Sequence, residues 1–279
     1  MSFLIRFARH WIAGETLDDA IVRAKKANNS GMGTIINYLG EHVRERLEAE
    51  QNLMEILRLL DNIEKSKVGA SISIKLTQLG LVIEKKLCSS NVEKIATSAA
   101  SKNIFIWFDM ENSPFTEDTI DLYLEILRKY GNTGIAIQSN LKRSENDVKR
   151  IAAAGGFIRL VKGAYSEKSG IAYRSRKEIT VNFSKLMDNL FYRSPFFAIA
   201  THDDLLINEA IEANKIHRKK LEFQMLMGVR EELKNQLVEK GLTVVDYIPY
   251  GKIWFPYTTR RLRERKRNIL LILRSVFDF

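Results

Sequence analysis

The chain has 279 residues, of which 45% are hydrophobic and 28% charged, and its formal net charge is +10. No apolar run reaches the roughly 18 residues that a membrane span needs, and the apolar start over residues 4–12 is too short and too charged for a signal peptide. The single cysteine, Cys88, excludes a disulfide within the chain and suits a reducing cytoplasm. The positive charge favours nucleic acid, an anionic lipid surface or an anionic cofactor, although a simple solvated basic surface explains it equally well.

Short apolar runs alternate with helix-like segments along the whole chain. A first amphipathic helix is expected over residues 17–28, because Thr16 and Asp19 have the spacing of a capping box and Gly31 follows its end. The predicted strands cover residues 33–39, 70–76, 104–110, 134–138, 157–162, 196–201, 221–226 and 243–248. The predicted helices after them cover residues 42–66, 92–101, 116–131, 144–155, 177–192, 205–216, 229–239 and 256–275.

This alternation predicts an α/β protein in which parallel strands form a barrel. The runs 104–110 and 196–201 show little polar alternation, as strands of a parallel sheet buried on both faces require. A barrel of this kind needs roughly 250 residues. We therefore predict an N-terminal helical segment, 1–32, that packs on a barrel over residues 33–279, in a single domain overall.

Polar side chains lie at the ends of all but the first predicted strand, where such barrels carry their active sites. They are Lys75, Asp109, Gln138, Arg159, Lys162, Tyr165, His202, Gln224 and Tyr247. One lysine in a strand is usually an edge or rim residue, but burying so many polar groups without partners would be costly. The strand ends therefore predict one polar site, and we predict no metal in it.

The last predicted helix carries a more specific pattern. Pro256 suits its first turn, and Tyr257, Arg260, Arg261 and Glu264 then share one helix face. Two guanidinium groups beside a tyrosine form a fork for a small carboxylate, and Glu264 can pair with Arg260. The alternative is a basic solvated helix, since further arginines and a lysine lie in the same segment.

Taken in chain order, these motifs resemble those of the proline dehydrogenase family. They read SIKLTQLGL, WFDMEN, RLVKGAY, ATHD, EFQMLMG and YIPYG, followed by RRLRER. The resemblance covers about residues 33–268 and fits the monofunctional type. It implies a distorted (β/α)8 TIM-like barrel that binds FAD noncovalently and oxidises L-proline to Δ1-pyrroline-5-carboxylate, the first step of proline catabolism. By this resemblance, proline C5 gives a hydride to flavin N5, and the electrons pass on to quinone or another acceptor.

The same resemblance assigns roles to individual residues. The proline carboxylate would be bound by Arg260, Arg261 and Lys75, with Asp109 beside Lys75. The proline ring would be surrounded by Ala164, Tyr165, Leu226, Tyr247 and Tyr257. Cofactor contacts are implied for Gln138, Arg159, Lys162, Gly163, His202, Gln224, Arg176, Lys177 and Glu264, of which Glu264 would brace the arginine helix. Asp203 departs from the family, which usually has asparagine after the histidine.

Electron transfer to quinone would bring the protein to a membrane. The positive charge and the apolar residues 269–272, near Phe277 and Phe279, suggest peripheral attachment of a cytoplasmic protein to the inner face of the cell membrane. The same apolar residues also fit the buried face of the last barrel helix, and this second interpretation is the favoured one.

Two other functions account for parts of the sequence. A Schiff-base aldolase barrel could use Lys75 or Lys162, but it leaves the arginine helix, Gln138 and Gln224 without a role. A nucleic-acid-binding module accounts for the net charge. The basic residues are spread along the chain, however, and no recognition motif is present, so nucleic acid is not expected as a partner.

Overall fold

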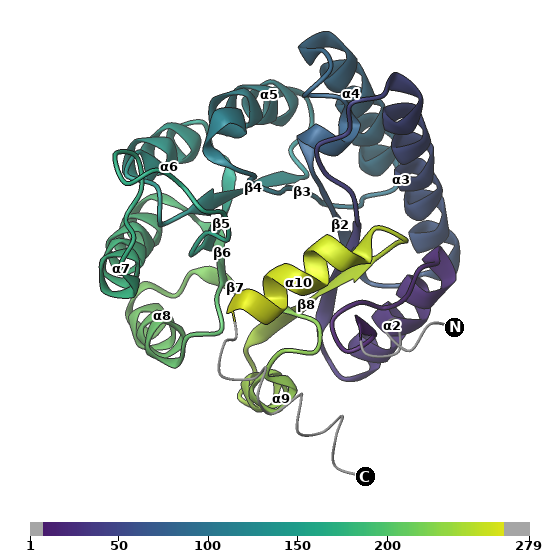
Figure 1. Cartoon of the computed structure of the whole chain (residues 1–279). Coiled ribbons are helices and arrows are strands. Elements are labelled where there is room, and N and C mark those ends of the chain that lie inside the picture. Colours follow the sequence, from purple (N-terminus) through teal and green to yellow (C-terminus); the bar gives the residue numbers. More distant parts are fainter. Residues whose placement is uncertain (1–7, 265–279) are drawn as a thin grey trace.

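The computed structural model describes residues 8–264, apart from the side chains of residues 260 and 262–264. Within these residues eight parallel strands close into a barrel in chain order, so that β1 pairs with both β2 and β8 (Figure 1). The strands are β1 (Gly33–Tyr38), β2 (Ala70–Ile74), β3 (Ile106–Phe108), β4 (Thr133–Gln138), β5 (Phe157–Val161), β6 (Phe196–Ala200), β7 (Lys220–Leu226) and β8 (Thr243–Tyr250). The predicted (β/α)8 TIM-like barrel is confirmed.

Helices surround the barrel on its outside (Figure 1). They are α2 (Leu17–Asn29), α3 (Arg46–Ser66), α4 (Lys85–Ser101), α5 (Thr116–Lys129), α6 (Ser144–Ala153), α7 (Arg176–Arg193), α8 (Asp204–His217) and α9 (Glu231–Glu239); the short 3-10 turns η1 (Leu76–Leu79) and η2 (Ser113–Phe115) follow β2 and β3. The predicted capping box of Thr16 and Asp19 begins α2. The predicted start of α4 at residue 92 was wrong, because the helix begins at Lys85 and already buries Cys88 in the core.

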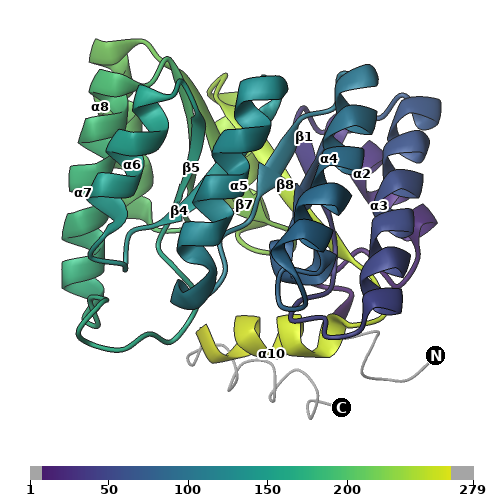
Figure 2. The ribbon, with the colours of Figure 1, turned by 90° about the horizontal axis from the view of Figure 1, so that it is seen from above.

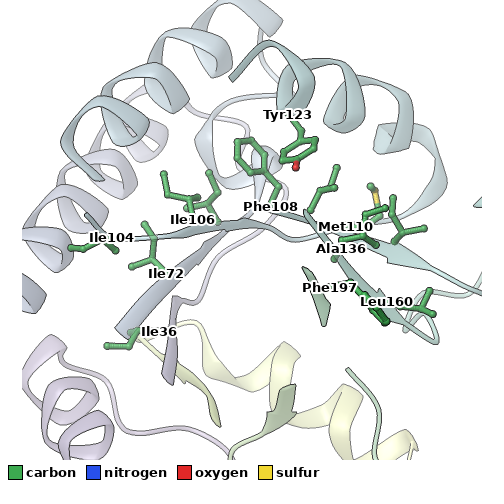
Figure 3. Packing of buried hydrophobic residues seen from close by; sticks show 14 of the residues in the cluster. Ile36, Ile72, Ile104, Ile106, Phe108, Met110, Tyr123, Ala136, Leu160 and Phe197 are labelled. Carbon is green, nitrogen blue, oxygen red and sulfur yellow. The ribbon is translucent and has the colours of Figure 1, made fainter. Parts of the chain in front are cut away.

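The main hydrophobic core fills the space between the strands and the outer helices. Ile72 of β2 and Ile106 and Phe108 of β3 face this space, and Tyr123 of α5 packs against Phe108 (Figure 3). Burial of each such apolar side chain stabilises the fold by roughly 1.5–3 kcal/mol. Neighbouring strand residues such as Trp107 belong to a separate cluster inside the barrel. Strand alternation therefore sorts the residues between the core and the barrel interior.

The helix that follows β8 does not return along the outer wall. α10 (Trp254–Glu264) crosses the carboxyl ends of the strands and lies over this opening, which we call the mouth of the barrel (Figures 1 and 2). Its buried Tyr257 packs in one cluster with Trp11, with Leu39 after β1 and with Val229 after β7. The position of α10 turns one face of this helix toward the barrel interior.

α2 covers the outer wall where β8 meets β1 (Figure 1). Arg23 of α2 donates a hydrogen bond to Asp246 Oδ2 on β8 at 2.9 Å, and Lys234 of α9 donates to Asp246 Oδ1 at 2.6 Å. Lys234 also donates to Glu231 Oε1 at 2.8 Å. These four residues form the Asp246 cluster, in which the Asp246 and Lys234 side chains are fully buried. A helix from before the barrel is thereby fastened to its last strand.

None of the helices within residues 8–264 is long and apolar enough to cross a membrane. The apolar segment 269–272, Phe277, Phe279 and the predicted end of the last helix at residue 275 lie outside the described residues. Their role at a membrane or in the barrel wall stays a prediction.

Candidate active site

Asp109, directly after β3, is the centre of a charged cluster at the mouth of the barrel. Asp109 Oδ1 accepts hydrogen bonds from Ser73 Oγ at 2.5 Å and from Arg159 Nη1 at 2.6 Å. Asp109 Oδ2 accepts hydrogen bonds from the Tyr247 hydroxyl at 2.6 Å and from Lys75 Nζ at 3.0 Å. These five residues form the Asp109 cluster, and it unites four of the predicted site residues.

Strand alternation explains why these side chains meet. Lys75 directly follows β2 and stands two positions after Ser73, and Asp109 directly follows β3 and stands two positions after Trp107. The pairing register places Ser73 beside Trp107, so both pairs face the barrel interior. Ser73 and Trp107 were not among the predicted site residues. Their spacing of two from the charged residues was the signal that could have found them.

The contacts within the Asp109 cluster set its protonation states. Burial raises the pKa of Asp109, but Lys75, Arg159 and the hydrogen bonds of Ser73 and Tyr247 outweigh it and hold that pKa at about 2. Burial also favours a neutral amine at Lys75, yet Tyr247 and Asp109 hold the pKa of Lys75 well above its usual value. Burial, and then the Asp109 charge, raises the pKa of Tyr247. At neutral pH the cluster therefore contains a carboxylate, an ammonium group and a neutral hydroxyl.

Arg159 of β5 is fixed by its neighbours in the barrel interior. Its Nε donates to Gln224 Oε1 at 2.5 Å, and its Nη1 donates to Asp109. The guanidinium carbon lies 4.6 Å from the centroid of the Trp107 ring and 5.6 Å from that of the Tyr247 ring. Nη2 is buried and has no hydrogen-bond partner among the described residues. Since buried donors are normally paired, Nη2 is a donor that a bound molecule can use.

The loop after β5 places three predicted residues near the mouth. Lys162 Nζ donates to Asp203 Oδ2 at 2.5 Å, and Asp203 also caps the start of α8. Gly163 has a φ of +101°, and a Cβ at this position would lie 2.2 Å from a neighbouring side-chain oxygen, so only glycine fits without strain. The Tyr165 hydroxyl donates to Glu41 Oε2, after β1, at 3.2 Å.

Gln138, His202 and Leu226 also lie at strand ends. Gln138 is buried, and its Nε2 donates to the backbone oxygen of Glu111 at 2.9 Å. His202 Nε2 accepts a hydrogen bond from the Leu226 backbone N–H at 3.0 Å. The Leu226 side chain packs against the apolar cluster that contains Tyr257. These contacts join the ends of β6 and β7 to the underside of α10.

Arg176, Lys177 and Ala164 are exposed and are not members of the Asp109 cluster. Arg176 and Lys177 are exposed at the start of α7, which a capping box of Ser175 and Glu178 begins. Ala164 is exposed in the loop after β5. The roles predicted for these three residues stay predictions.

α10 brings Tyr257 and Arg261 over the mouth of the barrel. Tyr257 is buried beneath the helix, and the Arg261 guanidinium carbon lies 5.4 Å from the centroid of the Tyr257 ring. For this pair the predicted common helix face is confirmed. The side chains of Arg260 and Glu264 lie outside the described residues, so their placement stays a prediction.

Among the described residues, Glu41, His42 and Glu111 form a group that could hold a metal ion. Each offers a ligand atom, and these atoms lie within 4.8 Å of one another. Both carboxylate oxygens of Glu111 already accept hydrogen bonds from Thr77, from the backbone N–H at 3.1 Å and from the hydroxyl at 2.5 Å. Burial raises the pKa of Glu111. The Thr77 contacts therefore account for this buried carboxyl group without a metal.

The sequence profile of the family described as proline dehydrogenase matches residues 20–269. The chain belongs to the proline dehydrogenase family. Proline dehydrogenase 1 of Bacillus subtilis subsp. natto is 31% identical over 272 residues, which cover 96% of this chain and 90% of that protein. Proline dehydrogenase 2 of Bacillus subtilis strain 168 is 31% identical over 286 residues, which cover 98% of this chain and 94% of that protein.

A solved structure shows the same fold as this proline dehydrogenase family member. Proline utilization A (PutA) from Bdellovibrio bacteriovorus, inactivated by N-propargylglycine, matches with a TM-score of 0.87 and 24% sequence identity. The match covers 92% of this chain and 32% of the PutA chain. This chain therefore spans about a third of that longer protein and corresponds to one barrel within it.

Proposed function

We propose that this chain oxidises L-proline to Δ1-pyrroline-5-carboxylate, the first step of proline catabolism. A noncovalently bound FAD would supply flavin N5 as the acceptor of the hydride from proline C5. The observation that carries the proposal is the family match over residues 20–269. The Asp109 cluster lies at the mouth of the same barrel, where this fold carries its chemistry. The residue roles below are part of the proposal.

The described residues fit a flavin. Arg159 Nη2 is a buried donor, and Asn140 Oδ1 is a buried acceptor, and neither has a hydrogen-bond partner among the described residues. A flavin carries the matching acceptors and donors on its ring. We assign Arg159, Gln138 and Gln224 to the ring region. The rest of the cofactor is assigned to Lys162, Gly163, His202, Arg176, Lys177 and Glu264.

Proline is a zwitterion with a compact apolar ring, so its site needs positive charge and aromatic walls. Lys75, from the barrel interior, and Arg261, from α10, provide positive charge at the mouth, and we assign both to the proline carboxylate together with Arg260. The ring is assigned to Tyr165, Tyr247, Tyr257, Leu226 and Ala164. Lys75 and Tyr247 are both anchored on Asp109, so they present fixed groups and orient the substrate.

The proline amine must be neutral before hydride loss, and the Asp109 cluster lacks a suitable base. Asp109 accepts protons poorly because its pKa is about 2. Lys75 keeps its own proton because its pKa is held well above the usual value. We therefore assign the proton to solvent water and give Asp109 a positioning role, in which it holds Lys75, Arg159 and Tyr247 in place.

The arrangement of the two candidate lysines argues against a Schiff-base aldolase. Such an enzyme needs a neutral lysine amine as its nucleophile. Lys75 is tied to Asp109 at 3.0 Å, and Lys162 is tied to Asp203 at 2.5 Å. The Asp109 contact favours the protonated amine of Lys75, which cannot attack a carbonyl, and the Asp203 contact occupies the amine of Lys162.

We further propose that quinone accepts the electrons at a membrane surface. Ile253 and Phe255, beside the start of α10, are 49% and 60% exposed. Together with the net charge of +10, they favour peripheral attachment with the mouth near an anionic lipid surface. Co-sedimentation with anionic vesicles should occur at low salt and weaken at high salt. Absence of binding at low salt would contradict this part of the proposal.

The visible spectrum of the purified protein tests the main proposal. With FAD supplied and no electron acceptor present, flavin bands near the usual ~450 nm should appear and bleach when L-proline is added. D-proline and L-alanine serve as controls and should leave the bands largely unchanged. Flavin that does not bleach with L-proline would contradict the substrate, and failure to bind FAD would contradict the cofactor.

A further inference from the structure

Glu222 of β7 extends the polar contacts of Arg159 deeper into the barrel. It lies two residues before Gln224, so the two side chains project to the same side of the strand. Glu222 is partly buried, and its Oε2 accepts a hydrogen bond from Gln224 Nε2 at 2.9 Å. Gln224 Oε1 in turn accepts a hydrogen bond from Arg159 Nε at 2.5 Å. The three side chains form a continuous line from β7 to β5.

The Gln224 amide can be useful to Arg159 in only one of its two orientations. Arginine has only donors, so it needs the amide oxygen and is repelled by the amide NH₂ group. Glu222 Oε2 accepts a hydrogen bond from the NH₂ end of the same amide. An acceptor oxygen at this position thus favours the orientation in which the Gln224 oxygen faces Arg159.

The position of the Arg159 guanidinium depends on that oxygen. Asp109 and Ser73 hold Nη1, and the Trp107 ring lies against the guanidinium group. Among the described residues Gln224 is the hydrogen-bond partner of Nε. Without it, the group could rotate about the Asp109 contact and move Nη2, the donor that we assign to the flavin.

We propose that Glu222 is a positioning residue of the flavin site, which acts through Gln224 to hold Arg159 in the orientation that binds the cofactor ring. This inference rests on the proposed function, because it assumes that Arg159 binds FAD. Its essential element is the accepted hydrogen bond and not the charge of Glu222.

Two conservative variants separate the contact from the charge. Glu222→Gln keeps an acceptor oxygen at the same reach and removes the charge, whereas Glu222→Asp keeps the charge and withdraws the oxygen by one methylene. We expect Glu222→Asp to raise the Kd for FAD by about tenfold, as loss of a hydrogen bond in a charged network does. We also expect it to lower the flavin reduction potential, because a displaced Arg159 stabilises the reduced ring less. Glu222→Gln should stay close to the wild type in both properties.

Titration of the apoprotein with FAD and spectroelectrochemistry measure these two properties without the reaction. The matched control repeats Glu222→Asp in a Gln224→Leu background, where the substitution should have no further effect. The inference is overturned if FAD binding is impaired in Glu222→Gln but not in Glu222→Asp, or if it is impaired in neither variant. It is also overturned if Glu222→Asp still weakens FAD binding in the Gln224→Leu background. Failure of the wild type to bind FAD would instead contradict the proposed function.

Discussion

Asp109 and Asp246 are two carboxylates with similar neighbours and different roles: Asp109 is partly buried, and Asp246 is fully buried. Each contacts one lysine and one arginine through hydrogen bonds. Asp109 has two further hydroxyl donors, Ser73 and Tyr247. Asp246 has instead the repulsion of Glu231. Burial raises the pKa of Asp246, and its two cations do not fully offset that burial, whereas the pKa of Asp109 is held at about 2.

The two clusters also differ in where they lie, and their positions explain why we assign only one of them to the active site. The Asp109 cluster lies inside the barrel beneath α10, close to Arg159 Nη2, which has no hydrogen-bond partner within residues 8–264 and which we assign to the flavin. The Asp246 cluster lies between β8, α9 and α2, on the outer wall of the barrel. Buried charge alone therefore does not indicate an active site. A charged cluster indicates one when it lies at the mouth of the barrel, where a ligand can reach it.

The largest expected effect is that of Arg261→Met, at the mouth. We expect FAD to remain bound and kcat/KM for proline to fall by about three orders of magnitude, mainly through KM, because the substrate loses a charged partner for its carboxylate. Steady-state kinetics and the flavin spectrum measure the two properties. Arg193→Met, at the exposed end of α7, is the control and should behave like the wild type. A near-normal KM in Arg261→Met would contradict the carboxylate role.

Lys234→Met, on the outer wall, should reduce stability and leave activity unchanged. We expect the free energy of unfolding to fall by about 3 kcal/mol, because the buried Asp246 loses one of its cations. The activity of the molecules that remain folded should be unchanged. Chemical denaturation measures the loss, and Lys215→Met, whose lysine is exposed beside Glu212, should change stability by less than about 0.5 kcal/mol. An equally small change in Lys234→Met would show that the buried pair does not stabilise the fold.

The two aspartates should have opposite effects on stability in acid. Asp109 has a folded pKa near 2, below the unfolded value, so its contribution of about 2 kcal/mol is present above pH 4 and is lost as the pH falls toward 2. Asp246 has a raised folded pKa, so its contribution is largest in acid and is lost as the pH rises through that value. Denaturation at pH 3–6 should therefore show a shallower acid loss in Asp109→Asn and a steeper one in Asp246→Asn. Parallel curves for both variants and the wild type would refute this assignment.

Asp203 is a third carboxylate, less buried than the other two, and should have the smallest effect. It pairs with Lys162, and the lysine lowers the pKa of Asp203 despite partial burial. Asp203→Asn frees Lys162 for a cofactor phosphate and retains a residue that can cap α8. We expect the Kd for FAD to fall about threefold, a typical effect of one partly screened charge. As a control, Asp204→Asn removes the neighbouring, more exposed charge and should not improve FAD binding. Equal Kd values for the wild type and Asp203→Asn would show that Asp203 does not compete with a cofactor phosphate for Lys162.

The strands could be predicted because a parallel strand buried on both faces is an apolar run between turn residues. The barrel then brought Lys75, Asp109 and Tyr247 together, because parallel strands end on one side. The position of α10 over the mouth could not be predicted from periodicity. A helical pattern shows that Tyr257 and Arg261 share a face, but it does not show what that face covers.

Two kinds of residue were also missed from the sequence: uncharged residues beside Asp109, and the charged residues of the Asp246 cluster on the outer wall. Ser73 and Trp107 carry no charge, and their roles depend on neighbours from other strands. Lys234 lies in a helix of mostly polar composition, where nothing distinguishes a buried lysine from solvated ones. Asp246 had a usable signal, because it stands in the apolar run of β8.

Because α10 follows the last strand, the helix that covers the mouth is synthesised after the whole barrel. All eight strands and α2 have been made once residue 250 has emerged from the ribosome. The seam between β1 and β8 can then close, with Arg23 on Asp246, before Tyr257 and Arg261 have emerged. A translation product that stops near residue 251 would keep the Asp109 cluster and lose the helix that covers it. Premature termination there would remove Arg261, which we assign to the proline carboxylate, and leave all eight strands.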